Sequence, residues 1–285
     1  MSDRELDAAW TTVIRPKGHW FDLRLRELWS YRDLIVLFVR RDFVAQYKQT
    51  ILGPLWHVVQ PLLTTLTFTI VFGRIARIPT DSLPPFLFYL SGNVLWGYFS
   101  NSFTKTSNTF VGNANVFGKI YFPRLVVPVS TLGTSLIGFV IQFVIFLCFL
   151  VYFIAQGAQV DPSPWILATP LLLLLMAGLG LGGGIILSSF TTRYRDLVSV
   201  VAFGISLFMY MTPIVYPLSA VPAAYRPLVM ANPITPIVEA FRFAFLGAGT
   251  ISVAHLTYTT IFTVAILICG ILIFNRIERT FMDTV

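Results

Sequence analysis

Residues 40–61, RRDFVAQYKQTILGPLWHVVQP, decide the fold, because a basic helix turns there into the first long apolar run. In and before this stretch, apolar residues recur every four positions, which on a helix of 3.6 residues per turn forms a slowly drifting stripe. The stripe consists of Tyr31, Ile35, Val39, Phe43 and Tyr47. Gly53 and Pro54 are expected to interrupt the helix before the apolar run. The pattern predicts an N-terminal amphipathic helix at a membrane interface.

The stripe is imperfect, which leaves a second interpretation of the same residues open. Leu37 and Val44 fall on the charged side of the helix, together with Arg40, Arg41 and Lys48. A helix that packs on its own domain would show a similar pattern, because one apolar face is buried in either case.

The composition is that of a membrane protein with several spans. Of the 285 residues, 56% are hydrophobic and 12% are charged, whereas a soluble domain carries about 25% charged residues. This predicts an all-α polytopic membrane protein. The first fifty residues are polar and basic, so no cleaved signal peptide is expected. The net charge of +7 comes from this arm and from short loops, so it is expected to orient the chain in the membrane rather than to bind nucleic acid.

Six apolar runs approach the length of about 20 residues that a transmembrane helix needs. They are residues 55–73, 86–104, 125–154, 165–190, 197–217 and 254–274. Residues 1–30 are then an N-terminal arm, and residues 31–285 form the transmembrane domain.

The positive charges predict which side of the membrane the two ends occupy. Six spans place both termini on one side, and sixteen of the twenty Lys and Arg residues lie on that side. Because basic loops stay in the cytoplasm, both termini are predicted to be cytoplasmic.

Two connecting segments differ from the short loops. The inner loop 105–124 is long and aromatic, with room for one helix across the membrane surface, so it is a candidate for contact with a partner. The outer segment 218–250 contains four prolines between apolar pieces that are too short to cross a bilayer. It is predicted to dip into the membrane and return as a re-entrant helical hairpin beside a pore mouth, with a plain extracellular loop as the alternative.

Apparent nucleotide and metal motifs do not fit their chemistry. Residues 112–120, GNANVFGKI, resemble a phosphate-binding loop, but the glycine spacing is one residue too long and Ile120 replaces the magnesium-binding hydroxyl. Gly178, Gly180 and Gly183 have dinucleotide-motif spacing inside a span, where small residues more often let helices approach closely. The three histidines are isolated in sequence, so no metal site is proposed.

The six predicted spans contain no Asp, Glu, Lys or Arg. Proton-coupled carriers typically use intramembrane ionisable residues, so that class is disfavoured. The same feature argues against a membrane-embedded enzyme, since acid–base chemistry needs titratable groups around one pocket. The simplest expectation is a transport subunit that takes its energy from a separate protein.

Aromatic residues are abundant, with 26 Phe, 11 Tyr and 6 Trp. A pore lined by aromatic faces and hydroxyls would suit sugar rings, because it offers apolar faces and few fixed charges. Candidate lining residues on the first and fifth spans are Phe68, Phe72, Phe208, Tyr210 and Tyr216.

Several stretches together resemble one family. They are RRDFVAQYKQTILGPLWHVVQPL, the loop FGKIYFPR, the turn YRDL, and YPLSAVPAAYRPLVMANPITPIVEAFR. In this order they are similar to the permease subunits of type-2 ABC exporters for bacterial polysaccharides, of the O-antigen and capsule kind. The resemblance runs from about residue 30 to the end of the chain.

The resemblance implies a homodimer of six-span permeases in the bacterial inner membrane. It implies two copies of a cytoplasmic ATPase subunit that binds ATP and Mg²⁺, so this chain itself needs no cofactor. A lipid-linked glycan would pass between the two permeases. Residues 31–47 would be the gate helix, and the loop 105–124 would dock on the ATPase, with Phe117, Lys119 and Tyr121 as candidate contacts.

Two alternatives remain open from the sequence. A teichoic-acid exporter, or a drug or lipid exporter, would have a similar permease and differ only in cargo. A membrane glycosyltransferase or lipid-phosphate enzyme would instead need acidic residues clustered at one membrane face. The candidates for such an acidic cluster are Asp33, Asp42 and Asp196.

Overall fold

The computed structural model describes residues 25–48, 50–113, 117, 122–191, 194 and 196–281. Within these ranges the chain is helical and contains no strand, which confirms the predicted all-α class. An all-helical chain suits a bilayer, because a helix satisfies its backbone hydrogen bonds within one segment.

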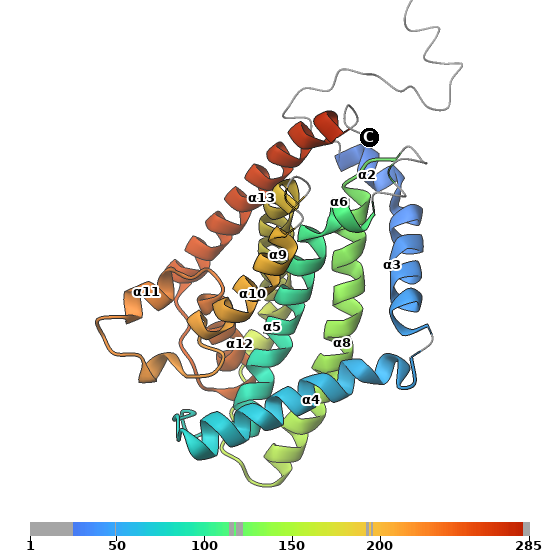
Figure 1. The fold of residues 1–285 in the computed structure, drawn as a ribbon. Helices are drawn as coiled ribbons and strands as arrows, with labels where there is room; N and C mark the ends of the chain where they lie inside the picture. Colours follow the sequence, from blue (N-terminus) through green and yellow to red (C-terminus); the bar gives the residue numbers. More distant parts are fainter. Residues whose placement is uncertain are drawn as a thin grey trace, which may run out of the picture.

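The helices are arranged as one bundle with short connections (Figure 1). The bounds are α2 Leu25–Ser30, α3 Arg32–Tyr47, α4 Trp56–Phe68, α5 Pro85–Ser107, α6 Thr109–Gly112, α8 Val126–Ala155, α9 Thr169–Thr191, α10 Leu197–Phe208, α11 Arg226–Ala231, α12 Thr235–Leu246 and α13 Val253–Phe281. A π-helical segment, Thr69–Ile75, extends α4, and a 3₁₀ turn, Pro164–Ala168, precedes α9.

The predicted break at Gly53 is confirmed. Helix α3 ends at Tyr47, and Thr50 closes the corner by donating its hydroxyl proton to the Tyr47 carbonyl at 2.9 Å. The Gly53 amide donates in turn to the Thr50 hydroxyl oxygen at 3.1 Å. Gly53 has φ +53°, which glycine adopts without the steric cost that other residues meet. A single 3₁₀ turn, Gly53–Leu55, then leads into α4.

Four helical segments are long and apolar enough to cross a membrane. They are Gly53–Ile75, Val126–Ala155, Pro164–Thr191 and Val253–Arg276, by length and composition. These match the first, third, fourth and sixth predicted spans. The fifth prediction corresponds to a shorter apolar helix, Leu197–Met211, because the chain turns into an irregular segment at Thr212.

The second predicted span corresponds to α5, which is long but more polar than the other four segments. It occupies the middle of the bundle, in contact with α4, α8, α9, α10 and α12 (Figure 1). Most of its residues are buried, including Ser91, Ser102 and Thr106. Because neighbouring helices surround α5, its polar side chains do not have to face lipid.

Small residues bring α5, α9 and α13 close together. A side chain at Gly184 would meet the Thr106 side chain of α5 at 2.7 Å, and one at Gly178 would meet Thr263 of α13 at 2.5 Å. A Cβ atom at Gly270 of α13 would approach the Gly182 carbonyl oxygen at 2.9 Å. The glycines of α9 therefore serve helix packing, as their position inside a span predicted.

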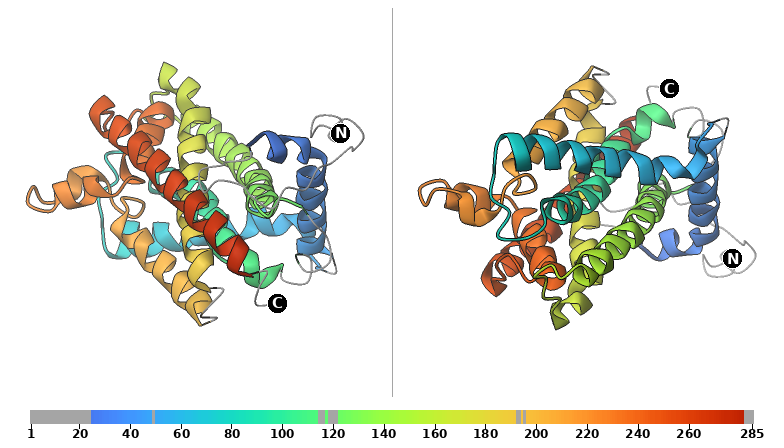
Figure 2. Two further views of the ribbon diagram at one scale, coloured as in Figure 1. Left: turned by 90° about the horizontal axis from the view of Figure 1, so that it is seen from above. Right: turned by 90° about the horizontal axis from the view of Figure 1, so that it is seen from below.

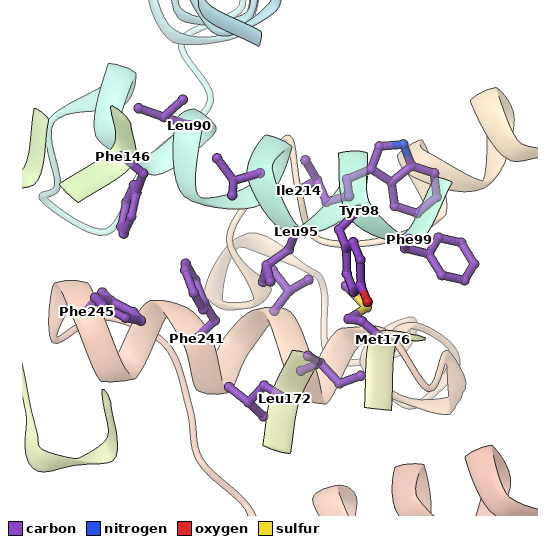
Figure 3. Packing of buried hydrophobic residues seen from close by; sticks show 14 of the residues in the cluster. Leu90, Leu95, Tyr98, Phe99, Phe146, Leu172, Met176, Ile214, Phe241 and Phe245 are labelled. Atoms are coloured by element: carbon purple, nitrogen blue, oxygen red, sulfur yellow. The ribbon is translucent and has the colours of Figure 1, made fainter. Parts of the chain in front are cut away.

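The main core combines aliphatic and aromatic side chains and lies among α5, α8, α9 and α12 (Figure 3). Phe241 and Phe245 of α12 pack against each other with ring centroids 4.6 Å apart, and Phe146 of α8 lies 5.6 Å from both rings. Aromatic pairs at such distances stabilise a fold beyond their buried area. This packing fixes α12 against the bundle.

Helix α3 stands at one edge of the bundle, with α11 at the opposite edge (Figure 2). It packs along α8. The contact is close, because a Cβ atom added at Gly133 of α8 would lie 2.7 Å from the side chain of Val39. Phe38 of α3 meets Phe122 edge-on at 5.5 Å. These contacts define a second aromatic cluster, which also holds Phe110 and Phe274.

The outer segment 218–250 contains α11 and α12. Helix α12 is buried along nearly its whole length against α5, α9 and α13, so the alternative of a plain loop does not describe it. It ends at Gly247, which has φ +71°. Whether α12 enters the membrane from the outer side stays a prediction.

Candidate functional site

Among the described residues, a polar cavity lies between α4 and α5, with walls from the end of α3, from α8 and from Met209 directly after α10. Its volume is about 270 Å³. The lining residues are Gln46, Tyr47, Trp56, His57, Gln60, Pro61, Thr64, Asn93, Trp96, Gly97, Ser100, Asn101, Gln142 and Met209. This set, called the α4–α5 cavity below, combines indole rings with side-chain amides and hydroxyls.

Helical spacing places the cavity wall on single faces of α4 and α5. Trp56, Gln60 and Thr64 are four residues apart on α4, and Trp96 and Ser100 are four apart on α5. Residues at this spacing lie above one another on a helix. The wall is therefore continuous along both helices.

Packing from behind holds the polar wall in place. Asn93 donates an amide proton to the Thr65 hydroxyl at 3.0 Å, which ties α5 to α4. The Trp96 ring packs on Phe99 and Phe208, with centroids 5.4 and 6.0 Å away. A cavity with pre-positioned groups loses less conformational entropy when it binds a ligand.

A narrow crevice of about 20 Å³ continues from this cavity between α5 and α8. His57, Gly97 and Gln142 line both spaces, and Lys105 lies at the crevice. The Lys105 ammonium donates to the Gln46 side-chain oxygen at 3.2 Å, which joins the end of α5 to α3. Tyr47 stacks edge-on with His57 at 5.3 Å, and burial raises the pKa of the Tyr47 hydroxyl.

A buried ion pair lies in α12. Glu239 and Arg242 are 3% and 2% exposed, and the Glu239 Oε1 to Arg242 Nη1 distance is 3.8 Å. The guanidinium also donates to the carbonyls of Pro213 and Ile214. The Glu239 carboxylate accepts a hydrogen bond from the Thr250 amide at 3.2 Å. Glu239 and Arg242 therefore neutralise each other within α12, and the guanidinium connects α12 to the segment that follows α10.

The same guanidinium reaches α5. Its carbon lies 3.8 Å from the centroid of the Phe88 ring. A side chain at Gly92 would meet Arg242 Nη2 at 3.0 Å and the Ile214 carbonyl oxygen at 3.3 Å. The absence of a side chain at Gly92 thus leaves room for the Arg242 guanidinium. Arg242, a charged residue outside the six predicted spans, therefore helps to hold the bundle together.

The five candidate lining aromatics lie in different surroundings. Phe68 and Phe72 pack edge-on at 5.4 Å, and Phe68 also meets Tyr89. Phe208 lies behind Trp96, at the α4–α5 cavity. Tyr210 is half exposed, and Tyr216 packs against the main core. The structure does not bring the five residues together, and their role in a channel stays a prediction.

Phe117 of the predicted docking loop is buried. It is 7% exposed and packs on Phe110 and Phe122, with centroids 5.8 and 5.7 Å away. Lys119 and Tyr121 lie outside the described residues. Phe117 therefore supports this region from within, and its proposed contact with a partner stays a prediction.

The stripe of α3 faces its own chain. Tyr31, Ile35, Val39, Phe43 and Tyr47 are all partly buried, whereas Val36, Leu37 and Val44 are exposed. The described part of α3 thus packs on its own chain, and its place at a membrane interface and its role as a gate helix stay predictions. Leu37 and Val44, which broke the predicted stripe, lie on the exposed face of α3 together with Arg40 and Arg41.

The acidic residues considered for an enzyme occupy different surroundings. Asp33 and Asp42 of α3 each lie beside an arginine, at 3.9 Å from Arg32 and 2.7 Å from Arg41. Asp196 directly precedes α10. Among the described residues, no three His, Cys, Asp or Glu side chains are placed to hold a metal ion.

The sequence did not single out the cavity residues Trp56, Gln60, Trp96 and Gln142. A usable signal was present, because Gln60, Asn93 and Gln142 are amides inside otherwise apolar runs. A buried amide needs a polar partner or water, so it marks either helix packing or a wet cavity.

Comparison with known proteins identifies the family. The ABC-2 type transporter family matches residues 33–246. The chain is 27% identical over 252 residues to the O-antigen export system permease protein RfbA of Klebsiella pneumoniae, covering 88% of this chain and 94% of that protein. It is 29% identical over 223 residues to a protein of the same name from Myxococcus xanthus, covering 78% and 83%.

A further relative is named for the transport of a different polysaccharide. The polysialic acid transport protein KpsM of Escherichia coli is 23% identical over 250 residues, covering 86% of this chain and 93% of that protein. The family match extends over most of the chain and includes α3, the α4–α5 cavity and α12. The chain therefore belongs to the ABC-2 type transporter family of membrane permeases.

Proposed function

We propose that this chain is the membrane subunit of an ATP-driven exporter that carries a lipid-linked polysaccharide from the cytoplasm to the outer side of the bacterial inner membrane. The names of the O-antigen and polysialic acid relatives support a polysaccharide cargo. The observation that carries the proposal is the α4–α5 cavity, because it places indole rings and amides inside an apolar bundle.

The chain would work as a homodimer of six-span subunits, with α5 and α10 completing the set of spans and both termini in the cytoplasm. Exposed apolar residues on α4 with its π-helical extension, and on α10 with the 3₁₀ turn that follows it, support a seam between the first and fifth spans of two copies. They are Leu63, Leu66, Ile70, Phe203, Leu207 and Met211. The glycan would pass along this seam, beside Phe68, Phe72, Phe208, Tyr210 and Tyr216.

ATP hydrolysis would belong to two copies of a cytoplasmic ATPase subunit, which would bind ATP and Mg²⁺. Membership of the ABC-2 type transporter family supports such a partner. The loop 105–124 would transmit the motion of the ATPase, because α6 within it contacts α9 and Phe110 stacks on Phe274 of α13 at 4.9 Å.

The test is deletion of the gene in its own host, with surface polysaccharide measured by immunoblotting of intact cells and by electrophoresis of the extracted glycan. We expect the surface polysaccharide to disappear and to return with a plasmid copy. Lipid-linked precursor should accumulate inside the deletion strain. Unchanged surface polysaccharide would contradict the proposal and would favour another cargo, such as teichoic acid, a drug or a lipid.

A further inference from the structure

We infer that the α4–α5 cavity is a binding site for one uncharged sugar residue of the transported glycan, built within each copy of the chain. The inference rests on the proposed function and deepens it, because it names where the cargo is held and by which groups. It places a sugar contact inside the subunit, in addition to the seam between two subunits.

The chemistry of the walls matches a sugar ring. Trp56, which is half exposed, supplies an indole face for the C–H face of a pyranose, and the buried Trp96 closes the wall of the cavity. Gln60, Asn101 and Gln142 supply donors and acceptors for the hydroxyls of the sugar. A sugar needs both, because each ring has apolar C–H faces and an edge of hydroxyl groups. A lipid tail would offer no hydrogen-bond partner to the side-chain amides of Gln60 and Gln142, which is costly in an apolar bundle.

The lining also indicates the charge of the ligand. None of the described residues that line the main cavity is Asp, Glu, Lys or Arg. A carboxylated or phosphorylated sugar would have to be desolvated there without a counter-charge. The ammonium of Lys105 lies at the narrow crevice, where it donates to Gln46. The cavity is therefore suited to a neutral sugar.

The size of the cavity limits the ligand to a single residue. Its volume of about 270 Å³ lies at the lower limit of small-ligand sites, which occupy about 300–1,000 Å³. Gly97 lies at the wall of this space and leaves it open, because it has no side chain. A Cβ atom added at Gly97 would lie 3.3 Å from the Gln142 side-chain oxygen and would have no other neighbour within 4 Å. A larger side chain at Gly97 would fill the cavity from inside the chain.

The test uses photo-crosslinking of the full-length chain, with its partner ATPase, in host cells. Benzoylphenylalanine replaces Trp56, which is half exposed at the cavity rim. The control position is Val144, which is also half exposed but is absent from the cavity wall and lies on α8. The probe is the cell's own lipid-linked glycan, compared with cells in which the first sugar transfer of its synthesis is blocked.

We expect irradiation to produce a ladder of glycan adducts at position 56 that disappears when glycan synthesis is blocked, and no ladder at position 144. The variant Gly97→Leu, combined with the label at position 56, should abolish the ladder while the complex still assembles by gel filtration. Gly97→Ala should retain the ladder, because a methyl group leaves most of the space open. Persistence of the ladder in Gly97→Leu would overturn the inference, since the glycan would then pass outside the cavity.

The gene deletion separates this inference from the proposed function. If the deletion abolishes surface polysaccharide and the label at Trp56 captures no glycan in an exporting complex, the sugar site is wrong and the exporter proposal stands. If the deletion leaves surface polysaccharide unchanged, both are wrong. An adduct of equal intensity at positions 56 and 144 would also overturn the sugar site, because it would report unspecific contact.

Discussion

Helices α5 and α8 lie against each other, yet they are built from different residues. Helix α8 is one of the four apolar candidate spans, and only 28% of its most apolar window is buried within the chain. Helix α5 is less apolar, but most of its residues are buried. The difference teaches that hydropathy reports how much of a helix faces lipid, whereas burial by neighbouring helices permits polar groups at the centre.

The comparison also separates two roles. The outer face of α8 presents Val140, Val144 and Val151, which need only an apolar environment. The faces of α5 carry specific partners, such as Thr65 for Asn93 and Arg242 for Gly92. We therefore expect substitutions around α5 to be costly and substitutions on the outer face of α8 to be tolerated.

The largest effect is expected for Arg242→Leu. The change would leave the Glu239 carboxylate and the carbonyls of Pro213 and Ile214 without their buried partner. Loss of one member of a buried ion pair costs about 3–5 kcal/mol. We expect a large loss of folded protein, measured by reversible unfolding in mixed micelles. Arg226→Leu on α11 is the control, because Arg226 is exposed, and an equal loss there would contradict the assigned role of Arg242.

A smaller but clear effect is expected where α9 meets α5. A Cβ atom at Gly184 would lie 2.9 Å from the Phe103 carbonyl oxygen and 2.7 Å from Thr106 Cβ. Overpacking of this kind costs about 1–3 kcal/mol, so Gly184→Ala should lower the thermal midpoint. Gly204→Ala on α10 is the matched control, since open space surrounds that position. Similar midpoints for the two variants would show that α5 and α9 are less closely packed.

The smallest effect is expected for single contacts on the two compared helices. Asn93→Ala removes the hydrogen bond to Thr65, and such bonds between membrane helices contribute about 0.6 kcal/mol on average. Val144→Ala on α8 should change stability by no more than about 0.5 kcal/mol, because the side chain is half exposed. Unfolding in mixed micelles should rank the two variants in this order. The reverse order would refute the distinction between α5 and α8.

The sequence predicted the all-helical class, the break at Gly53 and the positions of the long helices, because apolar runs and prolines report these features locally. It also predicted that the α9 glycines serve packing. It did not predict the partners of Arg242, since Gly92, Pro213 and Ile214 are distant in sequence. Contacts of this kind depend on how helices are arranged, which periodicity does not contain.

The candidate site was harder to predict for the same reason. The aromatic residues proposed for a channel were chosen by type and by span, and the structure divides them between Phe68 with Phe72 and Phe208 with Trp96. Phe117 was expected at a surface, but an aromatic residue in a loop is equally able to pack inward. The buried amides of α5 and α8 were the better signal, because an amide within an apolar run must have a partner.

The most direct test of the account is whether the space beside α5 holds water while the outer face of α8 meets lipid. Cys148 and Cys269 would be replaced by Ala, and single cysteines placed at Ser100, which lines the cavity, and at Val144. A charged, water-soluble maleimide added to open membrane fragments should label Ser100→Cys, because only a hydrated thiol ionises and meets the reagent. Val144→Cys should remain unlabelled until detergent is added. Labelling of Val144→Cys, with Ser100→Cys protected in the same membranes, would contradict the account.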